Sequence, residues 1–88
     1  MTVSFRKSFL RDLKKVKDSK VRDRVREAIH AVEDAESLAD VAGVKKMSGS
    51  SEYYRIRIGR FRIGLAVEGE EIEFVRVLGR EDIYKHFP

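Results

Sequence analysis

The hydrophobic pattern of this 88-residue chain changes its period once, near the middle. After a short alternating stretch at residues 2–5, apolar residues recur at helical spacing within residues 6–17 and 19–36. Recurrence every three or four residues is typical of amphipathic helices, whereas alternation is typical of a strand with one buried face. The pattern therefore predicts a strand followed by two helices. The break between the helices is short, and Asp18 or Ser19 can cap the second, so we expect an antiparallel helical hairpin.

In the second half of the chain the period becomes two. Alternating stretches at residues 54–58, 61–67 and 71–78 predict three consecutive strands. The first two are separated by Gly59 and Arg60, and glycine at the first position of a two-residue loop is typical of a type II′ hairpin turn. We therefore expect an antiparallel meander.

Two segments have no clear period. Residues 39–52 are predicted to be a connection, held to the core by Val41, Val44 and Met47, and its Ser-Gly-Ser-Ser segment is predicted to be a mobile loop. At the C-terminus, residues 79–88 are too few for more than a helical turn or an extended tail.

The order β-α-α-β-β-β predicts a single α+β domain over residues 1–88, with an antiparallel sheet covered on one face by the helical hairpin. A composition of 42% hydrophobic and 39% charged residues fits one globular domain. The absence of cysteine excludes disulfides and thiolate metal sites. No apolar run approaches the ~18 residues of a membrane span, and no signal peptide is visible, so we expect a cytoplasmic protein without a cofactor or metal.

Net charge is +4, but residues 52–88 are neutral, so an anion site there requires that charge be sorted in space. Alternation places Arg55 and Arg57 on one face of their strand and Arg62 of the next strand on the same face, away from the helices. Arg60 lies in the turn and is expected to be only solvated. Guanidinium groups bind phosphate bidentately, yet a solvated sheet face also fits the pattern.

The alternation also predicts which face of the sheet the aromatic residues and one further arginine occupy. Tyr54 and Phe61 are expected in the core, and Tyr53 on the arginine face. Arg76 alternates with presumed core residues, including Phe74. A bulge, an edge position or an acidic partner would each explain it.

Two motifs carry a resemblance to a known family. The hairpin residues Tyr54–Arg62, YRIRIGRFR, and the terminal residues Gly79–Tyr84, GREDIY, resemble the RelE/ParE superfamily of toxins from toxin–antitoxin pairs. The resemblance covers essentially the whole chain and implies a RelE-like fold. Its RelE-like members are endoribonucleases that cleave mRNA in the ribosomal decoding site without a metal. Each is held inactive by a cognate antitoxin protein.

The resemblance also implies residue roles. By position, Arg55 and Arg57 correspond to RNA-binding basic residues of the family, and Arg62, Arg80 and Tyr84 to residues of its active site. Attack of a ribose 2′-OH on the adjacent phosphate builds negative charge, which fixed cations stabilise. Unpaired bases commonly stack on aromatic rings, so Tyr84 can stack on a base or touch the 2′-OH. Tyr53, on the arginine face, can likewise contact RNA.

Proton transfer needs a residue other than arginine, which stays protonated at neutral pH. The titratable candidates near the C-terminus are Glu81, Asp82, Tyr84 and His86. His86 is a candidate catalytic residue because an unperturbed imidazole titrates near neutral pH. An acidic residue beside Arg80 is instead expected to cap a turn or to pair with it.

Two other functions stay open. A ParE-like toxin would share this fold and poison DNA gyrase without being a nuclease, although Arg80 and Tyr84 favour the RelE-like branch. An inactivated relative would only bind antitoxin. In each case we expect the antitoxin to use an apolar groove beside the helical hairpin.

Overall fold

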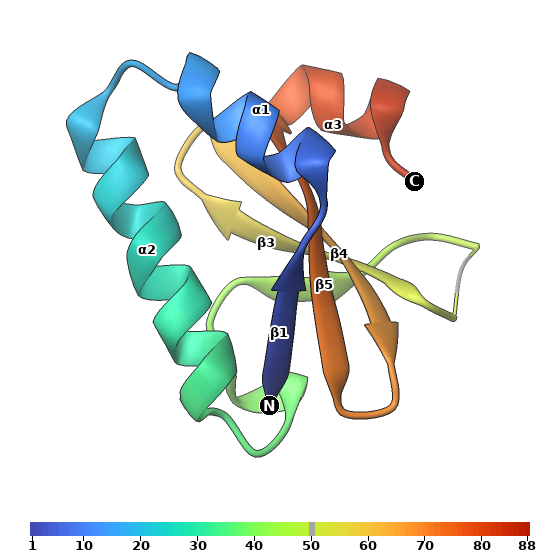
Figure 1. Ribbon diagram of the computed structural model, residues 1–88. Coiled ribbons are helices and arrows are strands. Elements are labelled where there is room, and N and C mark those ends of the chain that lie inside the picture. Colours follow the sequence, from blue (N-terminus) through green and yellow to red (C-terminus); the bar gives the residue numbers. More distant parts are fainter. Residues whose placement is uncertain (50) are drawn as a thin grey trace.

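The computed structural model describes residues 1–49 and 51–88 of the chain (Figure 1). In chain order its elements are β1 (Thr2–Phe5), α1 (Lys7–Lys15), α2 (Ser19–Asp34), a 3₁₀ turn (Leu38–Asp40), β2 (Val44–Lys46), β3 (Tyr53–Ile58), β4 (Phe61–Glu68), β5 (Glu71–Gly79) and α3 (Arg80–His86). The predicted α+β order is confirmed, with β2 and α3 in addition. The predicted mobile loop at residues 48–51 includes residue 50, which lies outside the described residues.

The strands form one sheet in the order β1-β5-β4-β3-β2. β1 pairs with β5 in parallel, and the other neighbours pair antiparallel, so the meander β3-β4-β5 is confirmed. The expectation that residues 39–52 form only a connection was wrong, because residues 44–46 pair with β3 as a short edge strand. Gly59 has φ +61° whereas Arg60 does not have a positive φ, which agrees with the predicted type II′ turn.

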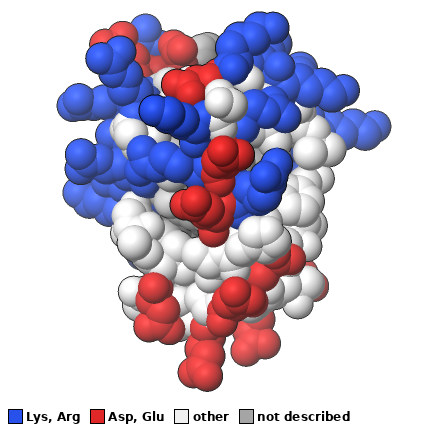
Figure 2. Space-filling model, turned by 90° about the vertical axis from the view of Figure 1, so that its left-hand side faces the viewer, with Lys and Arg blue, Asp and Glu red and all other residues white. Residues whose placement is uncertain are grey.

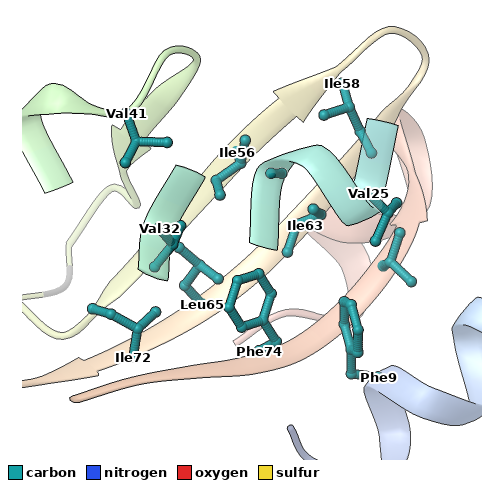
Figure 3. Packing of buried hydrophobic residues seen from close by; sticks show 12 residues of the cluster. Phe9, Val25, Val32, Val41, Ile56, Ile58, Ile63, Leu65, Ile72 and Phe74 are labelled. Atoms are coloured by element: carbon teal, nitrogen blue, oxygen red, sulfur yellow. The ribbon is translucent and has the colours of Figure 1, made fainter. Parts of the chain in front are cut away.

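The helical hairpin buries its apolar stripe against one face of the sheet (Figure 3). Phe9 of α1 and Val25 and Val32 of α2 meet side chains from the three central strands. Asp18 caps α2, since its carboxylate accepts a hydrogen bond from the backbone N–H of Lys20 (2.9 Å). The predicted core residues Tyr54 and Phe61 are partly buried at the rim of this cluster, as are Val3, Leu13, Val21, Ile29, Val44 and Val67.

β5 extends beyond its partner β1, and α1 covers the edge that this exposes. The Ser8 hydroxyl donates to the carbonyl of Val75 (2.6 Å), and the Asp12 carboxylate accepts from the backbone N–H of Val77 (3.1 Å). Unpaired strand edges are sites of unwanted association, and covering them is a common remedy. Side chains of α1 therefore complete the hydrogen bonding of β5 where β1 ends.

The position of Arg76 follows from the same contact. A register shift between Gly64 and Leu65, opposite β5, changes which residues of β5 face the helices. Arg76 then binds Asp12 through two hydrogen bonds, from Nε (2.7 Å) and Nη2 (3.2 Å). The bulge and the acidic partner considered from the sequence are thus both present.

The other face of the sheet is not simply open. The expectation of at most one helical turn at the C-terminus was wrong, because Arg80–His86 form α3, which lies across the sheet from α2 (Figure 1). Ile83 and Phe87 bury their side chains with Met47 and Val75 in a second hydrophobic cluster. In the part of the chain that the structure describes, no helix is long and apolar enough to cross a membrane.

Candidate functional site

The β3–β4 hairpin brings its arginines together as the alternation predicts. Arg57 and Arg62 are direct cross-strand partners, and Arg55 lies opposite Gly64 on the same face. Partners in an antiparallel pair have Cβ atoms about 4.5–5.5 Å apart, and like charges at that spacing are destabilising. The hairpin therefore holds positive charge together at a cost to stability.

Arg62 is buried rather than solvated. It is 7% exposed, and its Nη1 donates to the carbonyls of Gly59 (2.7 Å) and Phe61 (2.9 Å), which fixes the guanidinium at the turn. The buried Nε has no hydrogen-bond partner within residues 1–49 and 51–88. Buried polar groups are nearly always paired, so an unpaired donor on a fixed cation suits an anionic ligand.

α3 adds a second set of functional side chains. Arg80 and Tyr84 are four residues apart, so they share one face of the helix. The backbone N–H of Arg80 donates to the carbonyl of Arg60 (2.8 Å), which ties the start of α3 to the hairpin turn. A cavity of about 440 Å³ lies at this junction, lined by Arg57, Gly59, Arg60, Arg62, Gly79, Arg80, Glu81 and Asp82. One arginine from each of β3, β4 and α3 therefore lines it, and so does Arg60 of the hairpin turn, which was expected only to be solvated.

The arginines of the sheet change the pKa of Tyr84 on α3. Partial burial acts to raise the pKa of its phenol, but hydrogen bonding and charge from Arg55, and then from Arg62, outweigh burial and lower the pKa below the ordinary 10.0. The side chain is still 56% exposed, so a ligand can reach it. Tyr84 thus joins the arginine face to α3 and favours its charged form more than a free tyrosine does.

The structure separates two predicted site residues from this group. His86 lines two other cavities, one with Asp12 and Lys15 and one with Arg6 and Ser8, and does not line the arginine cavity. Tyr53 packs edge-on against Phe87, with ring centroids 5.5 Å apart. The roles of both residues stay predictions, and the geometry favours Tyr84 over His86 as a proton carrier at the arginines.

Sequence reasoning missed the helix that assembles the site. The signal was present, because Ile83 and Phe87 are four residues apart and so are Arg80 and Tyr84. Seven residues with two apolar positions are too few for the period to decide. Within the described ranges, no cluster of three or more His, Cys, Asp or Glu side chains is arranged to hold a metal ion.

Comparison with known proteins assigns the fold to a family. The family model described as the ParE toxin of the type II toxin–antitoxin system parDE matches residues 3–84. Toxin RelE3 of Methanocaldococcus jannaschii is 44% identical over 89 residues, which span all of both chains.

Solved structures of toxin–antitoxin complexes support the same family. The crystal structure of a RelB-RelE antitoxin-toxin complex from Methanococcus jannaschii matches with a TM-score of 0.79 and 42% identity, covering 96% of this chain and 98% of that one. The archaeal RelE-RelB complex from Pyrococcus horikoshii OT3 shares the fold, with a TM-score of 0.73 at 21% identity over 90% of this chain and 93% of that one. The chain therefore belongs to the RelE/ParE superfamily of toxins from type II toxin–antitoxin systems.

Proposed function

We propose that this toxin is a ribosome-dependent, metal-independent endoribonuclease that cleaves mRNA in the decoding site. The observation that carries the proposal is the convergence of Arg57, Arg62 and Arg80 on one cavity, with Tyr84 nearby interacting with Arg55 and Arg62. Its 44% identity to a protein named RelE toxin supports the RelE-like branch.

In the proposed reaction the ribose 2′-oxygen attacks the adjacent phosphorus while the bond from phosphorus to the 5′-oxygen breaks. The products are a 2′,3′-cyclic phosphate and a 5′-hydroxyl. Arg62 and Arg80 stabilise the negative charge that builds on the phosphoryl oxygens, since fixed donors aimed at developing charge act mainly on the transition state. Arg55 and Arg57 position the RNA backbone.

Tyr84 is the proposed proton acceptor. Its lowered pKa places more of the phenolate at a given pH than an ordinary tyrosine has, and the phenolate can take the proton of the attacking 2′-OH. Solvent supplies the proton that the departing 5′-oxygen needs. His86 has no assigned step in this scheme, because it lines two other cavities, whereas Tyr84 interacts with Arg55 and Arg62.

The experiment is expression of the toxin in cells, followed by mapping of mRNA ends. We expect growth arrest with the parent chain and relief of arrest by Arg62→Ala or Arg80→Ala. Full toxicity in a well-folded double variant would contradict the assignment. Absence of arrest with the parent chain would favour an inactivated relative that only binds antitoxin.

A ParE-like gyrase poison is the second candidate, because the matching family model is described as a ParE toxin. Incubation with gyrase and plasmid, in parallel with translating ribosomes, separates the two. Trapped cleaved DNA supports the second candidate, and cuts at defined positions in ribosome-bound mRNA support the first.

We further propose that a cognate antitoxin protein neutralises this toxin in the cytoplasm. The solved complexes of RelE with RelB support such a partner. A groove between α2 and β3, lined by Arg24, Glu27, Ala28, Ala31, Val41, Ala42, Gly43, Ile56, Arg57 and Ile58, suits the amphipathic helix of such a protein. Co-expression with the protein encoded beside the toxin gene is expected to restore growth and to yield a stable complex.

A further inference from the structure

α3 is attached to the sheet by a hydrophobic cluster of its own. Ile83 is fully buried and Phe87, just beyond the helix, is 4% exposed, and both pack with Met47 and Val75 on the face opposite the helical hairpin. This cluster is separate from the main core. The position of α3 therefore depends on a few contacts.

Phe87 rests on a glycine in the middle of β4. A Cβ atom built on Gly64 would lie 2.8 Å from Cγ of Phe87, well inside van der Waals contact. Gly64 does not have the positive φ that the turn glycines Gly59 and Gly69 have, so its backbone does not require glycine. Glycine within a strand costs about 0.5–1 kcal/mol relative to alanine. The missing side chain instead makes room for the Phe87 ring.

The contact between Gly64 and Phe87 lies beside two arginines of the sheet. Gly64 is the cross-strand partner of Arg55 and lies two residues from Arg62 on the same strand. Phe87 follows Tyr84 by three residues, about one helical turn. The contact between Phe87 and Gly64 therefore joins the chain just after α3 to the part of the sheet that carries Arg55 and Arg62.

We propose that Phe87, seated on Gly64, is a positioning residue that holds the Tyr84 hydroxyl against Arg55 and Arg62. A residue that only stabilises the fold would affect unfolding but not the titration of Tyr84 in the folded chain. The inference rests on the proposed ribonuclease for its effect on activity, while its effect on the phenol can be measured on the isolated toxin.

The test is a pH titration of the tyrosine ring carbons by NMR, with Tyr84→Phe assigning the signal. In Phe87→Ala the pKa of Tyr84 is expected to rise toward 10.0, because the helix end is released from the arginines. Gly64→Ala is expected to have the same effect by expelling the ring. Phe87→Leu, which keeps a large apolar side chain, is expected to restore part of the lowering.

Val32→Ala is the matched control, since it opens a cavity in the main core away from α3. The pKa of Tyr84 in Val32→Ala is expected to equal that in the parent chain. An unchanged pKa in folded Phe87→Ala and folded Gly64→Ala would overturn the positioning role.

A second measurement compares mRNA cleavage on ribosomes. Phe87→Ala is expected to cleave roughly 10- to 100-fold more slowly, the size of effect that a small misplacement of a reacting group produces. If the parent chain cuts no mRNA while the pKa of Tyr84 rises as expected in Phe87→Ala, the proposed ribonuclease function is contradicted and the positioning role of Phe87 is supported. Full cleavage by Phe87→Ala would contradict the role of Phe87 in catalysis.

Discussion

At the scale of single residues, the site combines cations that cannot lose their charge with one phenol that can. Arg62 is held by two carbonyls at the hairpin turn, and its Nε has no hydrogen-bond partner among the described residues. Tyr84 is held against the arginines and reaches solvent. In the proposed reaction, charge stabilisation and proton transfer are thereby divided between two kinds of side chain.

Replacing Arg62 tests charge stabilisation. Arg62→Ala is expected to slow cleavage of ribosome-bound mRNA by roughly 10²–10³-fold, as loss of one preorganised donor does in other enzymes. The control is Arg26→Ala, which removes the same charge from α2, where Arg26 faces Asp23 at 3.7 Å. Similar losses in both variants would mean that net charge, not the position of Arg62, matters.

The lowered pKa of Tyr84 gives a pH dependence. If the phenolate accepts the proton, the cleavage rate should rise with pH, and the midpoint of the rise should lie below 10.0, because the pKa of Tyr84 lies below its ordinary value. Tyr84→Phe should lower the rate and remove the rise. A pH profile measured under single-turnover conditions checks this, and an identical rise in Tyr84→Phe would exclude Tyr84 as the base.

The residues of the hairpin show what local pattern can predict. Alternation and a two-residue turn together fix the register, so the common face of Arg55, Arg57 and Arg62 could be derived from the sequence. The burial of Arg62 could not be derived from the sequence. It depends on the course of the chain around the hairpin turn and on α3, neither of which alternation describes.

At the scale of elements, α1 and α3 each complete what the sheet alone leaves unfinished. α1 covers the free edge of β5 through Ser8 and Asp12, and α3 brings Arg80 and Tyr84 to the arginine face. Both depend on contacts between distant parts of the chain: Asp12 and Arg76 are 64 residues apart. Such pairs leave no periodic signal, so the sequence predicted the hairpin helices and every strand except β2, but not these contacts.

Removing the carboxylate of Asp12 tests the attachment of α1. Asp12 is 4% exposed, and Asp12→Ala leaves the partly buried Arg76 unpaired and the N–H of Val77 without its acceptor. We expect a loss of about 3 kcal/mol in the free energy of unfolding, measured by urea denaturation. Arg6→Ala breaks the exposed pair of Arg6 with Glu73 and should cost less than about 1 kcal/mol. Equal losses would contradict the special role of Asp12.

At the scale of the whole molecule, charge is segregated. Figure 2 shows Lys and Arg over most of the upper part, where α1 and the start of α2 lie, with some Asp and Glu among them, whereas the lower end of this face carries Asp and Glu without Lys or Arg. With a net charge of only +4, this separation lets one end of the molecule attract a polyanion.

The segregation predicts a salt dependence. Binding to ribosomes should weaken at least tenfold between about 50 and 200 mM salt, because neutralised phosphates release counterions. Arg57→Ala should lower the slope of log affinity against log salt by about one. Affinity measured by co-sedimentation at several salt concentrations checks both values, and a flat dependence would contradict phosphate binding.

The central claim is cleavage by attack of a 2′-OH within the decoding site. The most direct measurement uses purified ribosomes programmed with an mRNA that carries a single 2′-deoxy nucleotide at the mapped cleavage position, beside the all-ribose control. The account predicts a cut with a 2′,3′-cyclic phosphate end in the control and no cut at that position in the deoxy mRNA. Equal cleavage of both mRNAs, or none of either while gyrase is trapped on cleaved DNA, would contradict it.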